Sequence, residues 1–206
     1  MCSDKISLTP LQESLLILQA SINHIGLALK VITPDDRIRD EDLKFTICNY
    51  ILIRLCAFLE EWSKLESLGS DKKVQFSLKI ASPAIDRIRQ WTGLTKVRSL
   101  LLAHGSRDKQ GIAHWPADVF AQFDAPTAYA EIILLGNCAI LAAKSVINGH
   151  NEEFQKGVKE LKDLQRPIKD KGIRTVEEIK EELNKIKAKM LEIAEDSLKD
   201  EKVKYV

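Results

Sequence analysis

Apolar residues recur at helical spacing along almost the whole chain, and this periodicity constrains the fold more than any other feature. Between Leu11 and Leu29, for example, they follow one another at steps of three or four, which places them on one face of an α-helix. Glycine (9) and proline (6) are scarce among the 206 residues, and no segment shows the alternation typical of strands. The sequence therefore predicts an all-α fold, an antiparallel helical bundle.

Turn and capping residues divide this pattern into separate helices. Thr9 can cap a helix, Pro10 suits the first helical position, and Gln12 completes a capping box. The second helix is apolar nearly all round between residues 47 and 59, so we expect it to be the central element. Residues 105–125 are expected to form an irregular loop of the length that often carries function. We expect helices over residues 10–31, 40–65, 71–80, 83–91, 94–104 and 125–148.

The composition changes after residue 150. Residues 151–206 contain 14 basic and 14 acidic residues among 56, whereas residues 1–150 contain only 17 and 16. We therefore expect a bundle domain over 1–150 and a charged helical extension over 151–206. Thr175 and Glu178 form a second capping box, and apolar residues follow from Val176 to Ile193 at alternating steps of three and four. This charged amphipathic helix is either a short coiled-coil seam or a helix docked on its own domain.

Composition also bounds the partners and the compartment. The net charge of +1 excludes a histone-like polycation and a polybasic membrane-surface module. We find no secretory leader, and the apolar runs are broken before the ~20 residues that span a bilayer, so no membrane is expected. The cysteines show neither a CxxC pair nor zinc-type spacing, so we expect a cytoplasmic protein with reduced thiols and without metal or cofactor. The cysteines are Cys2, Cys48, Cys56 and Cys138.

The segment from Lys96 to Arg107 carries the strongest chemical signal. Arg98 precedes His104 by six positions, and His104 ends a predicted helix just before Gly105. Imidazole titrates near neutral pH, and a helix C-terminus favours its protonated form. Arginine can hold a phosphate through two parallel hydrogen bonds. On an α-helix, however, six positions separate two side chains by about 120° and about 9 Å, so Arg98 and His104 do not share a face.

This stretch resembles the HEPN superfamily, whose signature is an arginine followed after four to six residues by a histidine. The resemblance covers about a dozen residues and implies a helical, metal-independent endoribonuclease of a toxin or phage-defence system. It also implies a homodimer, which would bring two copies of Arg98 and His104 together, and an antitoxin or other protein partner. Ser99 departs from the pattern, since active members usually have Asn, Asp or His there. That departure puts catalysis in doubt more than the fold.

Under this hypothesis the residues divide between chemistry and RNA binding. Arg98 would bind the scissile phosphate and His104 would transfer protons, as general acid or base. Four neighbours would contact RNA: Lys96, Ser99, Arg107 and Lys109. Arg87, Arg89 and the nearby tryptophans Trp91 and Trp115 would extend a basic, stacking surface suited to single-stranded RNA.

Two alternatives belong to other functional classes. In the first, the chain is a non-catalytic helical interaction module in which Arg98 and His104 are structural. In the second, it is a structural dimeriser that works through residues 176–193. Outside the Arg98 segment, we expect Glu60 and Glu61 to be solvated and His150 to face solvent.

Overall fold

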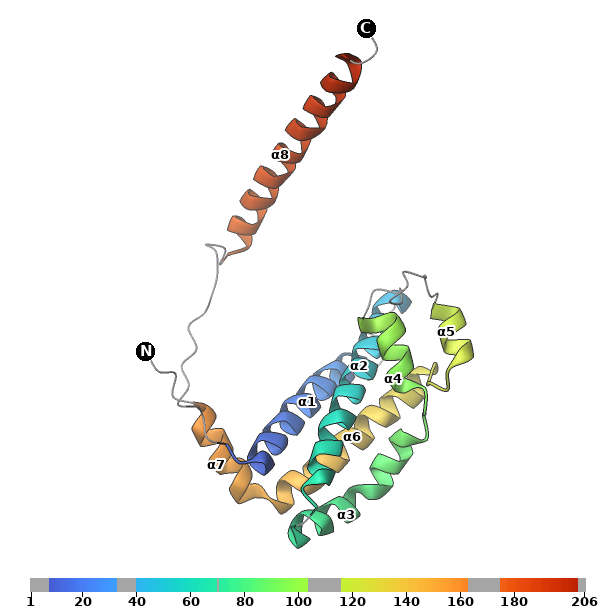
Figure 1. Cartoon of the computed structure of the whole chain (residues 1–206), viewed down its shortest axis with the longest axis vertical. Helices are drawn as coiled ribbons and strands as arrows, with labels where there is room; N and C mark the ends of the chain where they lie inside the picture. The colour runs from blue at the N-terminus through green and yellow to red at the C-terminus, as the bar shows by residue number, and fades with distance from the viewer. Residues whose placement is uncertain (1–7, 33–39, 70, 104–115, 163–174, 204–206) are drawn as a thin grey trace. The chain divides into compact units, whose positions relative to one another are not determined.

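A computed structural model describes residues 8–32, 40–69, 71–103, 116–162 and 175–203. The described part of the chain is helical and contains no strand, which confirms the all-α prediction (Figure 1). Its elements are α1 (Pro10–Ile32), α2 (Glu41–Ser67), α3 (Lys72–Arg89), α4 (Leu94–Val97), the π-helix η1 (Arg98–Ala103), α5 (Pro116–Gln122), α6 (Tyr129–Gly149), α7 (Asn151–Lys162) and α8 (Val176–Val203).

Both predicted capping boxes are confirmed. The amide of Thr9 donates to Gln12 Oε1 at 3.0 Å, and the amide of Gln12 donates to Thr9 Oγ1 at 3.2 Å. Thr175 and Glu178 repeat this reciprocal pair at the start of α8, at 2.8 and 3.2 Å. In each case two amides at the helix start, which have no partner within the helix, gain a side-chain acceptor.

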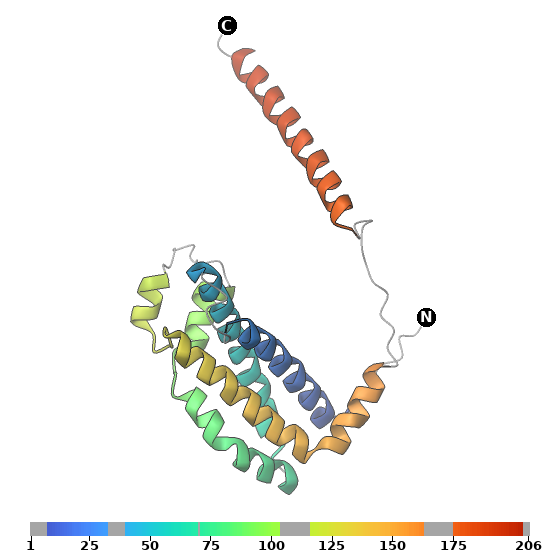
Figure 2. The same cartoon turned by 180° about the vertical axis from the view of Figure 1, so that it is seen from behind.

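The long helices pack antiparallel. Ser14 near the start of α1 contacts Glu61 near the end of α2. Gly136, in the first half of α6, faces Leu29 near the end of α1. Ser77 of α3 meets His150, which directly follows α6. α1 therefore runs antiparallel to α2 and α6, and α3 runs antiparallel to α6 (Figures 1 and 2).

The main core lies between these four helices. α6 packs against α1, α2, α3 and α7, so the central position that we predicted for α2 is shared with α6. The buried side chains of α1 follow the predicted stripe, including Leu15, Leu18 and Ile25. Cys48, Cys56 and Cys138 are buried free thiols within this core, and burial raises the pKa of each.

One predicted helix start is wrong. We expected Pro83 to begin a new helix, but α3 runs without interruption from Lys72 to Arg89 with Pro83 inside it. Proline lacks the amide that would donate to the carbonyl of Lys79. The hydroxyl of Ser82 donates to that carbonyl instead, at 3.0 Å. Ala81 and Ile85 on either side of the proline are buried, so packing also favours a continuous helix.

The predicted helix over residues 94–104 and the loop over 105–125 also differ in detail. The first is a single α-helical turn, α4, followed by the π-helix η1, a helix type whose characteristic hydrogen bonds span five residues rather than four. The second contains a helix, α5, over Pro116–Gln122. Residues 104–115 lie outside the described part of the chain.

The chain divides into two compact units, Met1–Leu164 and Gln165–Val206. The boundary lies later than the expected one at residue 150 because α7 packs with the bundle. Gln12 of α1 donates to Glu153 of α7 at 2.9 Å, and Phe154 packs against the main core. A Cβ at Gly157 would lie 2.9 Å from Leu16 of α1, so glycine there allows the close approach. α8 is the only element described in the second unit.

By length and composition alone, α1 and α6 are apolar enough to cross a membrane, with mean hydropathies of 1.6 and 1.7. We had expected the apolar runs to be too short for this. Burial in the bundle also explains why α1 and α6 are so apolar, since 39% and 50% of their most apolar 18-residue segments are buried. The absence of a membrane partner stays a prediction.

The α1–α6 interface provides a matched pair of glycines. A Cβ at Gly136 would lie 3.2 Å from Ile25 and 3.3 Å from Leu29, whereas a Cβ at Gly26 would meet only Ile140, at 3.9 Å. Alanine improves helix propensity equally at both positions, but only Gly136→Ala overpacks the interface. We expect Gly26→Ala to raise the free energy of unfolding by about 0.5–1 kcal/mol. Gly136→Ala should be less stable than Gly26→Ala by about 1 kcal/mol or more.

Urea denaturation of the two variants measures this difference. Equal stabilisation by both substitutions would show that Gly136 is not tightly packed.

Candidate functional site

The segment that carries Arg98 begins at a turn fixed by Asp124. The amide and the hydroxyl of Thr92 both donate to Asp124 Oδ2 at 3.0 Å, and the amide of Gly93 donates to the Asp124 carbonyl at 2.7 Å. A Cβ at Gly93 would lie 2.6 Å from backbone atoms of Asp124, so only glycine fits there. These contacts set the direction in which α4 and η1 leave α3.

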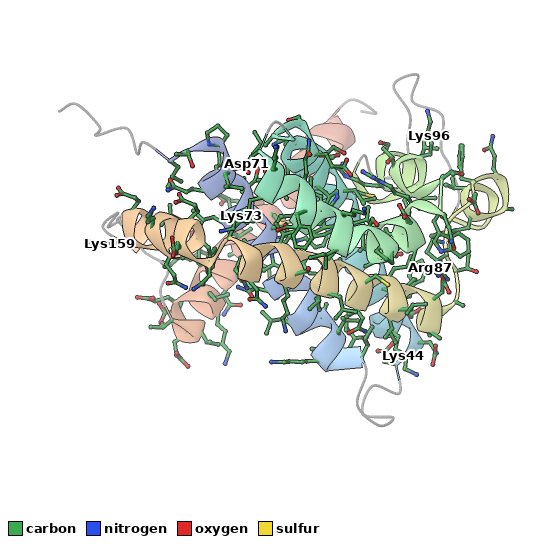
Figure 3. All side chains as sticks on the ribbon, turned by 90° about the horizontal axis from the view of Figure 1, so that it is seen from below. Lys44, Asp71, Lys73, Arg87, Lys96 and Lys159 are labelled. Carbon is green, nitrogen blue, oxygen red and sulfur yellow. The ribbon has the colours of Figure 1, made fainter. Side chains whose placement is uncertain are left out.

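Two apolar anchors hold α4 in place. Leu94 is buried in the main core, and Val97 is buried in a second small cluster with Val119 and Ala125. The two anchors are three positions apart, which places them on one side of the helical turn. Lys96 lies between them in sequence, is exposed, and points away from the bundle (Figure 3).

Arg98, the first residue of η1, forms an ion pair with Glu60 of α2. The side chains of Arg98 and Glu60 are 29% and 59% exposed. An ion pair in such a position contributes roughly 0–1 kcal/mol, so its main effect is to orient the guanidinium. Glu60 is therefore not simply solvated, and Arg98 is directed towards α2.

The same pair acts on a buried thiol one turn earlier in α2. Burial raises the pKa of Cys56 to about 11; the positive charge of Arg98 opposes this shift and the negative charge of Glu60 adds to it. Cys56 is therefore a protonated thiol at neutral pH. A nucleophilic cysteine needs the thiolate form, so the environment gives Cys56 a packing role.

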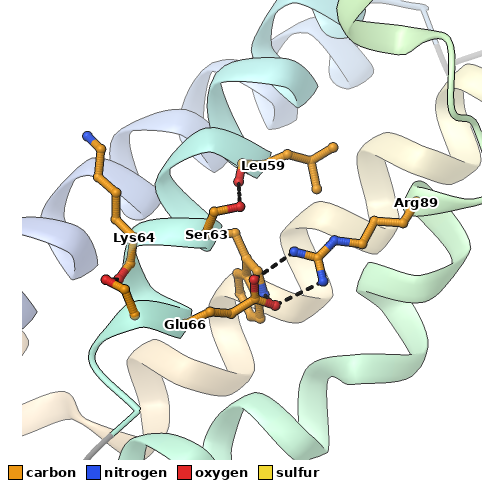
Figure 4. A network of polar contacts seen from close by, with 7 residues as sticks. Leu59, Ser63, Lys64, Glu66 and Arg89 are labelled. Atoms are coloured by element: carbon orange, nitrogen blue, oxygen red, sulfur yellow. Dashed lines mark hydrogen bonds and ion pairs between the residues drawn. The ribbon is translucent and has the colours of Figure 1, made fainter.

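The predicted basic surface is largely neutralised by carboxylates from other helices. Arg89 forms two parallel hydrogen bonds with Glu66, at 2.9 and 2.7 Å (Figure 4). Arg87 pairs with Glu131, which also accepts from Trp91 Nε1 at 2.8 Å. Sequence reasoning missed these carboxylates because they are 23 to 44 positions away in the chain. The tryptophan is likewise held in a contact between α3 and α6.

The structure thus brings together only part of the predicted site. Four basic residues of the predicted site are described: Arg87, Arg89, Lys96 and Arg98. Of these, Lys96 alone has no carboxylate partner within the described residues. Ser99 is half-buried in η1 next to Arg98. His104, Arg107 and Lys109 lie outside the described residues, so the pairing of Arg98 with His104 stays a prediction. The α-helical separation expected for that pair does not apply, because residues 98–103 form a π-helix.

Two other expectations are wrong. Glu61, expected to be solvated, is buried, and it accepts from Ser14 Oγ at 2.7 Å and from Lys64 Nζ at 3.0 Å. His150, expected to face solvent, is 3% exposed at the end of α6. Its Nε2 lies 3.3 Å from Ser77 Oγ of α3. Both residues are buried by contacts with remote helices.

The environment of His150 lowers the pKa of its imidazole. Burial is the main cause and the charge of Lys73 adds to it, while Asp71 and Glu153 oppose the shift. Lys73 and Asp71 both lie at the start of α3 (Figure 3). The folded protein therefore favours the neutral ring at physiological pH.

Among the described residues, no three histidine, cysteine, aspartate or glutamate side chains lie close enough together to hold a metal ion.

Comparison with known proteins adds no relative. No protein-family model, curated protein or solved structure gives a significant match to this chain. The HEPN resemblance therefore rests on residues 96–107 alone.

The lowered pKa of His150 predicts a pH-dependent stability. As the pH falls below the ordinary value of 6.5, the unfolded chain binds a proton at His150 before the folded chain does. The free energy of unfolding should therefore be highest above pH 6.5 and should fall until the pH passes the lower folded pKa. His150→Gln, which cannot titrate, should remove this part of the slope. Denaturant titrations between pH 7.5 and about pH 5 compare the two proteins. The same slope in both would contradict the assignment.

Proposed function

We propose that this chain is a helical interaction protein in which α8 joins several copies to one another. The observation that carries the proposal is the apolar stripe of α8. Its five described members are 46–64% exposed, and no other element is described in their unit. The stripe consists of Val176, Ile179, Leu183, Ile186 and Met190.

The spacing of this stripe supports a coiled coil. Steps of three and four assign Val176, Leu183 and Met190 to heptad position a, and Ile179 and Ile186 to position d. At the centre of the stripe, Leu183 at a lies between Ile179 and Ile186 at d, a combination that favours three or four strands over two. We therefore propose an assembly larger than the homodimer that the HEPN resemblance implies.

The charges beside the stripe support a parallel arrangement of identical helices. Glu182 occupies a g position and Lys187 the following e position, so two parallel copies place opposite charges together. In an antiparallel pair, the e positions face each other and Lys180 would lie beside Lys187 of the other copy. The g positions also face each other there, and they pair Glu182 with Lys189. Only the parallel orientation has an attractive contact without a repulsive one.

The mass of the protein in solution tests this proposal. Light scattering during gel filtration should give three or four times the 23.3 kDa of one chain. Leu183→Lys should reduce the mass to that of one chain, because it places a charge in the apolar seam. Ala188→Lys, on the opposite face of the same helix, should leave the mass unchanged.

A single-chain mass for the wild-type protein would overturn the proposal and favour α8 docked on its own bundle. Circular dichroism of both variants provides the control that the helices remain folded.

A second candidate is the HEPN-like, metal-independent endoribonuclease. The observation that favours it is the π-helix Arg98–Ala103 directly before His104, since π-helical turns are frequent at functional sites. The ion pair with Glu60 counts against it, because Arg98 would have to exchange a carboxylate for the phosphate. For this reason the interaction protein is our first proposal.

RNA cleavage in the presence of EDTA tests this candidate. Under it, the wild-type protein cleaves single-stranded RNA and His104→Ala lowers the rate by about 10²–10⁴-fold, the usual contribution of a general acid or base. Glu60→Gln should increase RNA affinity, because it releases Arg98. Absence of cleavage by the wild-type protein, or equal rates for wild type and His104→Ala, would remove the candidate.

A further inference from the structure

An open groove of about 810 Å³ runs along the bundle between α1 and α6. Its lining includes the buried side chains Ile22 and Leu29 of α1 and the partly buried Ile140 of α6. Asn23 and Asn137 add an amide from each helix. The groove therefore combines apolar surface with polar groups on both sides.

One exposed leucine lines this groove, and helical spacing places two more on the adjoining surface of α6. Leu27, which lines it from α1, is 61% exposed. On α6, Leu134 and Leu141 are 45% and 65% exposed, and their spacing of three or four from Asn137 places them on its face of the helix. Contiguous exposed apolar side chains with a polar rim are typical of a surface that binds another molecule.

The charged side chains that line the groove are both positive. Lys30 and Lys144 both line the groove, and neither has an ion pair among the described residues. The sequence contains no acidic residue between Glu13 and the end of α1, and none between Glu131 and the end of α6. The groove thus offers cations without a carboxylate from either of its own helices.

The two lysines lie at opposite ends of the groove. Gly26 and Ile140 are neighbours across the antiparallel interface, and each lysine follows one of them by four residues. Because the helices run in opposite directions, the two lysines are separated by about eight residues, or about 12 Å along the axis. A helix lying in the groove would meet them with residues seven or eight positions apart.

We infer that this groove binds an acidic amphipathic helix of a partner protein. The partner carries apolar residues towards Leu27 and Ile140 and carboxylates, two turns apart, towards Lys30 and Lys144. A second copy of the same face is not the occupant, because it would place lysine beside lysine. The inference is independent of α8, since it rests on the charge and shape of the α1–α6 face alone.

Binding of designed peptides to the full chain tests the inference. The probe is a fluorescent helical peptide of about 18 residues with two glutamates seven positions apart and leucines between them; a matched peptide has lysines in place of the glutamates. Fluorescence anisotropy should give a micromolar Kd for the acidic peptide and at least ~10-fold weaker binding of the basic one. The Leu183→Lys variant serves as the parent protein, so that the α8 stripe does not compete.

Reversing the charges of the groove should reverse this preference. The double variant Lys30→Glu/Lys144→Glu is expected to bind the basic peptide better than the acidic one. The control is Lys72→Glu/Lys79→Glu, which makes the same change in net charge at two exposed lysines of α3 seven positions apart. This control should keep the preference of the parent.

Three results would overturn the inference. The first is a Kd above about 1 mM for the acidic peptide. The second is an equal effect of both charge reversals, which would indicate a general charge effect. The third is binding of anionic phospholipid vesicles, but not of the acidic peptide, that the groove variant abolishes; this would identify a membrane surface as the occupant.

Discussion

Close packing around α6 is the constraint on which the rest of this structure depends. The buried face of α6 is built largely from small residues, including Gly136, Ala139, Ala142 and Ala143. Small side chains let neighbouring helices approach, and the larger residues of α1, α2 and α3 fill the remaining space. Because a tightly packed interior tolerates little change in volume, this arrangement fixes the relative positions of the helix ends. The positions of the turn before α4 and of the contacts at the end of α6 depend on this packing.

The positions of the helices determine what the basic segment can do. Glu60 and Glu66 of α2 and Glu131 of α6 meet Arg98, Arg89 and Arg87, in that order. These pairs are partly exposed, so each contributes little to stability, but together they engage the three guanidinium groups with carboxylates. Composition could not show these ion pairs, because an arginine counts the same whether or not a carboxylate lies beside it. The bundle therefore converts a cluster of arginines into contacts between helices.

Local patterns were enough to predict the helices but not the partners of their polar side chains. The periodicity and the capping boxes at Thr9 and Thr175 depend on residues within one or two turns, and they were predicted correctly. Pro83 was misread because the Ser82 hydroxyl replaces the missing amide. The apolar steps of three and four after Leu94 are those of an α-helix, so they gave no sign of the π-helix η1. The burial of Glu61 and His150 depends on Ser14 and Ser77, which are 47 and 73 positions away.

The apolar stripe of α8 and the groove between α1 and α6 are flanked by different charges, and this difference suits them to different partners. Beside the apolar stripe of α8, Glu182 and Lys187 carry opposite charges, so parallel identical helices complement one another there. Between α1 and α6 both flanking charges are positive, and only a different, acidic helix complements them. An assembly built through α8 would carry one such groove on every copy. A multivalent partner would then bind more tightly than the affinity of one groove allows, because each contact after the first is intramolecular. Weak binding by a single groove is therefore enough for a stable complex if the assembly and the partner are both multivalent.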